Sequence, residues 1–270
     1  MKRKNIQIRN IIFIILCVIL SGILVFFVID DKKTIEMEQQ KVLKNNNGKQ
    51  YEKKSSKENI VPVNGISCWG DEFIKKQEAN IYSYPAVLQN ELQENGYNIT
   101  VENNLLGGAS SLSVMKFAGI ADDVINTYIG EHQEMQGASL SEKEISVRTF
   151  SEDELKRNDQ DSIPIIFMGY YGGWNNDLEE LIKQQQLVLN TFDANKDKFL
   201  IIGIPPMNGS VDKETYDSAM QKKWGKHYMN ATTIAAPKQV ASYDGQNKIA
   251  IAIYEKLKEL KYIVKDNTYE

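Results

Sequence analysis

Two neighbouring acidic residues, Asp71 and Glu72, are the side chains in this sequence with the clearest capacity for chemistry. They lie in the stretch SCWGDEF, residues 67–73, just before its last residue, and the stretch follows an apolar run. In α/β proteins, functional groups gather beyond the carboxyl ends of buried strands. At such a corner Glu72 can act as a base, a nucleophile or a hydrogen-bond acceptor. Neighbouring side chains on an extended segment point to opposite sides, so we do not expect the two carboxylates to work as a pair.

A base or nucleophile needs partners, and the sequence offers few of them. Its two histidines are His132, in the polar connecting segment GEHQEMQ, and His227, just before a predicted short strand. We expect a surface or strand-end role for His227 and a role outside catalysis for His132. Asp244 precedes a glycine, where a turn or cap role is favoured over that of a relocated acid. No cluster of His, Cys or carboxylate residues has metal-ligand spacing, so neither a metal nor a cofactor is expected.

The elements that must position these residues alternate between short apolar strands and amphipathic helices. This alternation predicts an α/β fold, a three-layer sandwich with helices on both faces of a mainly parallel, flavodoxin-like sheet. Residues 137–161 are polar and strand-prone in parts, like an insertion. The predicted strands are 60–68, 99–106, 163–168, 199–204 and a short one around Tyr228, and the predicted helices are 84–95, 110–117, 177–190, 212–223 and 246–260.

Loops that follow parallel strands share the carboxyl edge of the sheet, where ligands of such folds bind. Aromatic residues are expected at this edge as well, and flat rings can hold sugars or acyl groups. For Trp69 and Trp174 we favour packing over the end of the sheet. For Tyr171, packing and lining a ligand pocket are equally open. The loops placed together in this way are 71–72, 107–108 and 170–174.

Three sequence blocks at this edge resemble those of the SGNH or GDSL hydrolase superfamily of esterases and deacetylases, in particular its Firmicutes branch. The blocks read CWGDE at 68–72, YPAVLQ at 84–89 and YGGWN at 171–175. The carboxyl-terminal IAIYEKLKELKY is similar to the last helix of that branch. The resemblance covers residues 60–262 and implies the α/β sandwich of that superfamily.

The same resemblance implies a degenerate catalytic set. Glu72 occupies the place of the family's serine nucleophile, and Tyr171 that of the asparagine that donates to the oxyanion. Gly108 matches the glycine whose amide completes the oxyanion hole. The family's Asp-x-x-His block should lie near 237–247, but PKQVASYDGQN contains no histidine. A serine mechanism needs a nucleophile and an oriented base, and an oxyanion hole alone does not start the reaction.

The amino-terminal part of the sequence predicts an anchor and a tether. A basic tail, 1–10, precedes nineteen uncharged residues, 11–29, which are long enough to span a bilayer. The positive-inside rule then leaves the amino end in the cytoplasm and the bulk outside the cell membrane. Residues 30–58 are too polar to fold alone and form a linker. The expected extracytoplasmic domain, 59–270, has a net charge of −10, which gives no reason to expect a nucleic-acid partner.

These features favour one function and leave two alternatives. The favoured one is a membrane-anchored protein with an SGNH-hydrolase-like domain, catalytically impaired, that binds acylated cell-envelope glycans or small acyl esters or assists an envelope-modifying enzyme. The candidate pocket and oxyanion residues are Asp71, Glu72, Gly108, Tyr171 and Trp174. One alternative is an active esterase, deacetylase or acyltransferase with rearranged residues, in which His132 would have to reach Glu72. The other is a purely structural or interaction protein.

Overall fold

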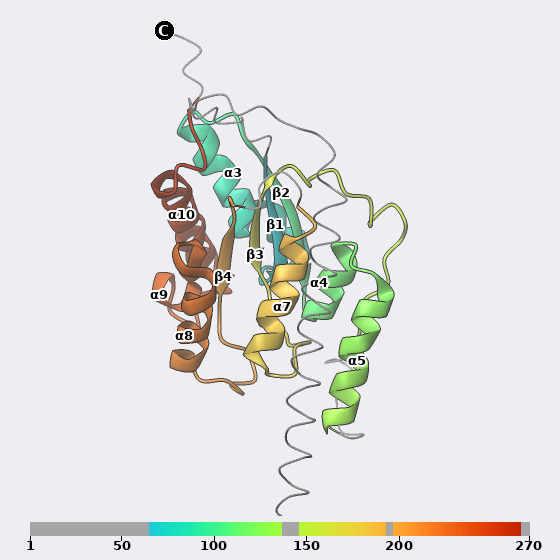
Figure 1. Ribbon diagram of the computed structural model, residues 1–270. Coiled ribbons are helices and arrows are strands. Elements are labelled where there is room, and N and C mark those ends of the chain that lie inside the picture. Colours follow the sequence, from blue (N-terminus) through green and yellow to red (C-terminus); the bar gives the residue numbers. More distant parts are fainter. Residues whose placement is uncertain (1–64, 137–145, 193–196, 266–270) are drawn as a thin grey trace, which may run out of the picture. The chain divides into compact units, whose positions relative to one another are not determined.

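A five-stranded, entirely parallel sheet lies at the centre of the fold (Figure 1). The computed structural model describes residues 65–136, 146–192 and 197–265. The strand order is β2-β1-β3-β4-β5, the flavodoxin-like order of doubly wound α/β proteins. The predicted α/β class is therefore confirmed. The strands are β1 (Gly65–Glu72), β2 (Thr100–Gly107), β3 (Ile163–Phe167), β4 (Leu200–Gly203) and β5 (Tyr228–Asn230).

Helices cover both faces of this sheet because alternate side chains of each strand point to opposite faces. On β1, Cys68 belongs to the core on one face and Trp69 to the core on the other. The first face packs against α3 and α10, which lie side by side in Figure 1, and the second packs against α4, α7 and α8. The helices are α2 (Lys76–Tyr82), α3 (Tyr84–Glu94), α4 (Ser111–Phe117), α5 (Asp122–Gln136), α7 (Leu178–Leu189), α8 (Lys213–Trp224), α9 (Ala231–Ile234) and α10 (Tyr243–Glu259).

The first strand ends later than the sequence predicts. Its ladder with β2 continues through the pairs Asp71 with Leu106 and Glu72 with Gly107. The two acidic residues are therefore the last residues of β1, whereas we expected them in the loop beyond it. The predicted start of this strand, residues 60–64, lies outside the described residues.

Three helices and one loop also differ from the prediction. Helices α2, α5 and α9 were not expected, and His132 therefore lies on a helix where a connecting segment was predicted. Helix α10 begins at Tyr243, three residues earlier than expected, because the Ser242 side chain accepts a hydrogen bond from the N–H of Gly245 and caps it. Residues 146–161, part of the predicted insertion, contain no strand.

This 146–161 segment is fastened to the sheet by a partly buried arginine, Arg157. The Arg157 guanidinium pairs with Asp159 at 2.5 Å and lies 4.4 Å above the ring of Trp69. Asp159 also accepts hydrogen bonds from Ser67 at 2.5 Å and from the indole of Trp69 at 2.9 Å. These charge-assisted bonds keep the pKa of Asp159 below its usual range, although burial opposes them.

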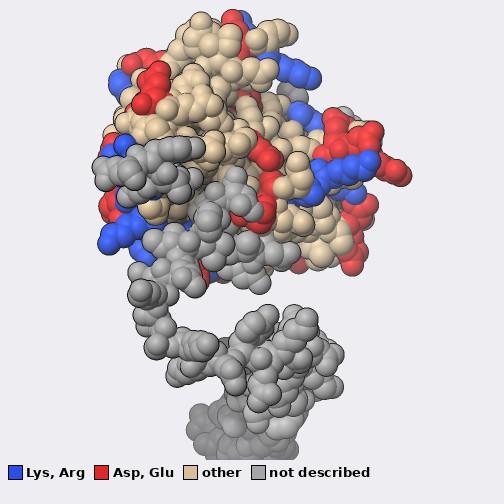
Figure 2. Space-filling view, turned by 90° about the horizontal axis from the view of Figure 1, so that it is seen from above, with Lys and Arg blue, Asp and Glu red and all other residues tan. Residues whose placement is uncertain are grey.

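Charged side chains of both signs are interspersed on the face of the domain shown in Figure 2. Several exposed ion pairs in the described part, such as Lys156 with Asp153 and Lys258 with Glu255, also join opposite charges. No helix among the described residues is long and apolar enough to cross a membrane. The predicted anchor, 11–29, and the linker, 30–58, lie outside those residues.

Candidate functional site

The ends of β1 and β3 define the candidate site. Chain connections run outward in opposite directions from these two neighbouring strands, and ligands of doubly wound folds bind at such a switch point. Gly70 allows the strands to approach closely there. It has φ +122°, and a Cβ atom on it would lie 2.1 Å from the carbonyl oxygen of Phe167.

Asp71 joins these two strand ends from inside the protein. Its side chain is fully buried, and its Oδ2 accepts a 2.8 Å hydrogen bond from the backbone N–H of Tyr170, just beyond β3. Burial raises the pKa of Asp71 to about 8, and the N–H groups of Tyr170 and Gly169 oppose that rise. Oδ1 has no hydrogen-bond partner among the described residues. Asp71 therefore supports the loop after β3 and does not face a substrate.

Glu72 points to the opposite face of the sheet from Asp71, as neighbours on a strand do. It is 7% exposed, and its Oε1 accepts a 2.8 Å hydrogen bond from the N–H of Ile74. Burial raises the pKa of the Glu72 carboxyl, while the Ile74 amide and the Asn103 side chain hold it partly down. The carboxylate is thus turned back onto its own loop, and the two acidic residues do not form a pair.

Tyr171 and Gly108 flank Glu72. The hydroxyl of Tyr171 donates to the backbone carbonyl of Glu72, 3.2 Å away, and its ring lies 6.0 Å from that of Phe73. Burial raises the pKa of Tyr171 to about 12, with the charge of Asp71 as the next cause. Gly108 follows β2, is exposed and has φ +63°. The structure therefore brings Glu72, Tyr171 and the end of β2 together at one edge.

The loops after β2 and β3 are locked to each other. The N–H of Ser111 donates to the carbonyl of Gly172 at 2.9 Å, and its hydroxyl donates to Gln184 at 2.5 Å. Gln184, on α7, in turn donates to the carbonyl of Gly173. Gly173 has φ +92°, and a Cβ atom on it would meet Ser111 at 2.8 Å. Hydrogen bonds between loops that are far apart in the sequence thus hold this edge of the sheet in place.

His132 belongs to this supporting network. It is 1% exposed, and its Nε2 lies 2.6 Å from Oε1 of Glu180. Glu180 also accepts a 2.7 Å bond from Gln184, which connects the histidine to the loop network. One ring nitrogen of His132 is therefore engaged with Glu180, on α7, and no hydrogen bond joins His132 to Glu72 in the described part of the chain.

The other two candidates lie where the sequence suggested. His227 precedes β5 at the amino-terminal edge of the sheet, opposite the candidate site, and stacks on Phe199 with ring centroids 4.1 Å apart. Asp244 lies in the first turn of α10 and pairs with Lys248 at 2.7 Å. Neither touches Glu72.

The tryptophans are packing residues. Trp174 is fully buried, and its indole donates to the carbonyl of Gly169 at 2.7 Å. Trp69 is buried in the middle of β1 under Arg157, so it does not lie at the edge where we expected it. Among the described residues, no group of three or more His, Cys, Asp or Glu side chains is arranged to hold a metal ion.

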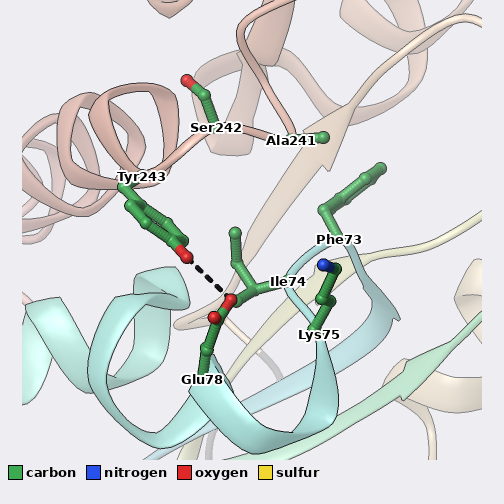
Figure 3. A pocket seen from close by; sticks show the side chains of 7 residues that line it. All are labelled: Phe73, Ile74, Lys75, Glu78, Ala241, Ser242 and Tyr243. Atoms are coloured by element: carbon green, nitrogen blue, oxygen red, sulfur yellow. Dashed lines mark hydrogen bonds between the residues drawn. The ribbon is translucent and has the colours of Figure 1, made fainter.

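A pocket of about 370 Å³ opens next to Phe73, the residue that follows β1 (Figure 3). One side is formed by residues 73–75 and Glu78, directly after β1, and the other by residues 241–243, at the start of α10. A 2.7 Å hydrogen bond from the hydroxyl of Tyr243 to Glu78 joins the two sides. Neither Glu72 nor Tyr171 lines this pocket, although Phe73 packs against Tyr171 and connects the two places.

Sequence reasoning missed the pocket residues and the supporting network. Lys75 and Glu78 come directly after the strand that carries Glu72, so the rule that ligands bind beyond strand ends could have selected them. Tyr243 belongs to the PKQVASYDGQN segment, where the resemblance led us to expect a histidine and not an aromatic ligand contact. Nothing in the sequence signals the contacts of Gln184 or Asp159, because each depends on segments far apart along the chain.

The fold and the site define a doubly wound, parallel α/β protein. Its two acidic residues, Asp71 and Glu72, lie at the switch point between β1 and β3. No protein-family model matches the sequence, and no curated protein is significantly similar to it. A solved structure of the psychrotrophic esterase EstA from Pseudoalteromonas sp., inhibited by monoethylphosphonate, aligns with 74% of this chain and 100% of its own, with 14% sequence identity and a TM-score of 0.44. A similarity at this level does not show which reaction, if any, this chain performs. A function must therefore be inferred from the residues described above.

Proposed function

We propose that this chain is a membrane-anchored, extracytoplasmic protein that keeps the layout of an SGNH hydrolase without its serine reaction. It binds acylated cell-envelope glycans or assists an enzyme that modifies them. One observation carries the proposal: at the position of the nucleophile stands Glu72, whose carboxylate is held by the N–H of Ile74. A carboxylate turned onto its own loop, with neither histidine in contact with it, does not reproduce the serine and base of that reaction.

The lack of an available base supports the same conclusion. General-base catalysis requires a ring nitrogen within about 3 Å of the group that loses its proton, or one bridging water. The Nε2 atom of His132 is instead 2.6 Å from Glu180, and His227 lies at the opposite edge of the sheet. The rearranged esterase that we considered would need His132 to leave a buried pair.

The surviving scaffold supports ligand binding over a purely structural role. The interlocked loops at Ser111 and Gly173 and the buried carboxyl of Asp71 all hold the edge of the sheet where a ligand would sit. A pocket opens beside that edge, and its volume lies at the lower end of the range for small-molecule sites, about 300–1,000 Å³. Membrane attachment through 11–29 and an outer location belong to the proposal on sequence grounds.

The test is hydrolysis of p-nitrophenyl acetate by the full-length chain in detergent micelles. We expect no turnover above the buffer rate for the unvaried protein, for Glu72→Ala and for Glu72→Ser. The serine variant is the informative one, because a serine without a base is only an alcohol. Turnover by the unvaried chain that Glu72→Ala abolishes would establish the rearranged esterase.

Binding is tested separately with acetylated and deacetylated glycan fragments from cell envelopes. The chain is expected to retain acetylated fragments preferentially on an affinity column. Retention of neither kind, together with no turnover, would favour the interaction protein and end the proposal.

A further inference from the structure

The pocket next to Phe73 has one wall whose position is fixed before any ligand arrives. The ring of Tyr243 stacks on that of Tyr82 with centroids 4.1 Å apart and planes inclined by 20°. Its hydroxyl is held by Glu78 at 2.7 Å, as the dashed line in Figure 3 marks. Tyr82 covers one face of Tyr243, and the remaining surface of that ring lines the pocket. A ring held by a stacked neighbour and a hydrogen bond loses little freedom when a ligand packs against it.

This aromatic wall is open to solvent. Tyr243 is 46% exposed and Tyr82 is 39% exposed, unlike the buried aromatic residues of the two cores. A flat, exposed ring with a polar tip suits a ligand that has an apolar face and hydroxyl groups at its edge. A pyranose ring has both, because its axial C–H groups form a face and its hydroxyls lie around the rim.

The rest of the pocket combines apolar and charged groups. Phe73 and Ile74 on one side and Ala241 on the other are apolar, while Lys75 contributes an exposed ammonium group and Glu78 a carboxylate. The apolar residues suit a short acyl group. Lys75 suits an anionic group on the same ligand, and Glu78 can accept a hydrogen bond from a hydroxyl.

We propose that this pocket binds a single sugar ring that carries both a short acyl group and a carboxylate. The ring packs on Tyr243, the acyl group lies against Phe73 and Ile74, and the carboxylate pairs with Lys75. A volume of about 370 Å³ is sufficient for one sugar ring with small substituents. The inference rests on the proposed function and names the ligand class that it leaves open.

Three sugars separate the two recognised groups: N-acetylmuramic acid has both, N-acetylglucosamine lacks the carboxylate, and muramic acid lacks the acyl group. Binding to the full-length protein in micelles is measured by saturation-transfer NMR titration. We expect N-acetylmuramic acid to bind tightest, and loss of either group to weaken binding by about fivefold, the size of one exposed ion pair or one small apolar contact.

Lys75→Gln is the diagnostic variant. It should lower the affinity for N-acetylmuramic acid to that for N-acetylglucosamine and leave the affinity for N-acetylglucosamine unchanged. Lys222→Gln, an exposed lysine on α8, is the matched control and should change neither. Tyr243→Ala should remove binding of all three sugars. Tyr243→Phe keeps the ring but loses the bond to Glu78, and it should weaken all three in parallel even if the alanine variant fails to fold.

Equal affinity for the three sugars, or no effect of Lys75→Gln, would overturn this inference. If acetylated envelope fragments still bind in that case, the proposed function stands and the binding place lies elsewhere. Ester turnover would instead overturn the proposed function, whatever the outcome for the pocket.

Discussion

The hydroxyl of Tyr171 donates a hydrogen bond to the backbone carbonyl of Glu72, across a distance of 3.2 Å. The Tyr171 side chain thus fastens the backbone of Glu72 at the end of β1. Because this hydroxyl already donates its proton to a carbonyl, it is not available to donate to a second oxygen.

Removing this bond should have a small and measurable cost. We expect Tyr171→Phe to lower the free energy of unfolding by about 0.5–1 kcal/mol, because a partly exposed, neutral hydrogen bond contributes about that much. Chemical denaturation followed by tryptophan fluorescence measures the change. Tyr170→Phe is the control: the Tyr170 backbone N–H, which binds Asp71, is unaffected by it. Equal losses in the two variants would show that the Tyr171 hydroxyl is not engaged as described.

The buried Asp71 predicts a pH dependence of stability. Its pKa is about 8 in the folded state, against 3.8 for the unperturbed group. A folded pKa above the unfolded one means that the folded protein binds the extra proton. The contribution of Asp71 to the free energy of unfolding is therefore fully present below about pH 4. It decreases as the pH rises toward 8. We expect a loss on the order of a few kcal/mol across this window from this residue.

Asp71→Asn isolates that contribution. The amide keeps an oxygen for the N–H of Tyr170 and imitates the protonated acid, so the variant should gain stability relative to the unvaried protein as the pH rises from 5 to 8. Thermal unfolding at several pH values measures the difference. Parallel curves for the two proteins would contradict a raised pKa. Glu152→Gln, at an exposed position, serves as the control for a general charge effect.

The strands of the sheet could be predicted from the sequence because buried parallel strands are short, apolar and bounded by turns. Strands β2 to β5 and helices α3, α4, α7, α8 and α10 were predicted at nearly their observed places, whereas β1 was predicted to end at Cys68 and ends at Glu72. Helix α5 was missed because most of its residues are polar, and its inward side is a sparse series that includes Ile125 and His132. A histidine on the buried side of a helix resembles a loop histidine when only polarity is considered.

The candidate site was predictable in part. The loops after β1, β2 and β3 lie at one edge of the sheet, as predicted, because the carboxyl ends of parallel strands share that edge. The orientation of Glu72 was not predictable, because it depends on an amide two residues away. The pocket could not be predicted either, since Glu78 and Tyr243 are brought together only by the packing of α2 against α10.

Gly70 is predicted to be indispensable for folding. Its φ of +122° is unfavourable for any side chain, and the Cβ atom of an alanine would lie 2.1 Å from the carbonyl oxygen of Phe167 on the neighbouring strand. Both strands are central, so neither can move aside. We expect Gly70→Ala to lower the free energy of unfolding by more than about 4 kcal/mol and to yield little soluble protein.

Gly108→Ala is the matched control for Gly70. It also has a positive φ, +63°, but nothing lies within 4 Å of the added Cβ atom. The unfavourable positive φ alone should then lower the free energy of unfolding by about 1–2 kcal/mol. Comparing soluble yield and melting temperature of the two variants separates the steric clash from the backbone preference. Similar values would mean that β1 and β3 are less closely apposed than described.

His132 should prove structural when it is replaced. His132→Ala leaves Glu180 buried without its 2.6 Å partner, and a buried carboxylate that loses a partner typically costs about 3 kcal/mol. Gln133→Ala, one residue along the same helix and exposed, should cost less than about 0.5 kcal/mol. Near-ultraviolet circular dichroism during thermal unfolding reports both values.

Because Glu180 also holds Gln184, and Gln184 holds the carbonyl of Gly173, the His132→Ala variant should increase amide hydrogen exchange in the loop after β3 as well. A destabilised protein whose exchange in that loop is unchanged would show that His132 supports the helix pair but not the edge of the sheet.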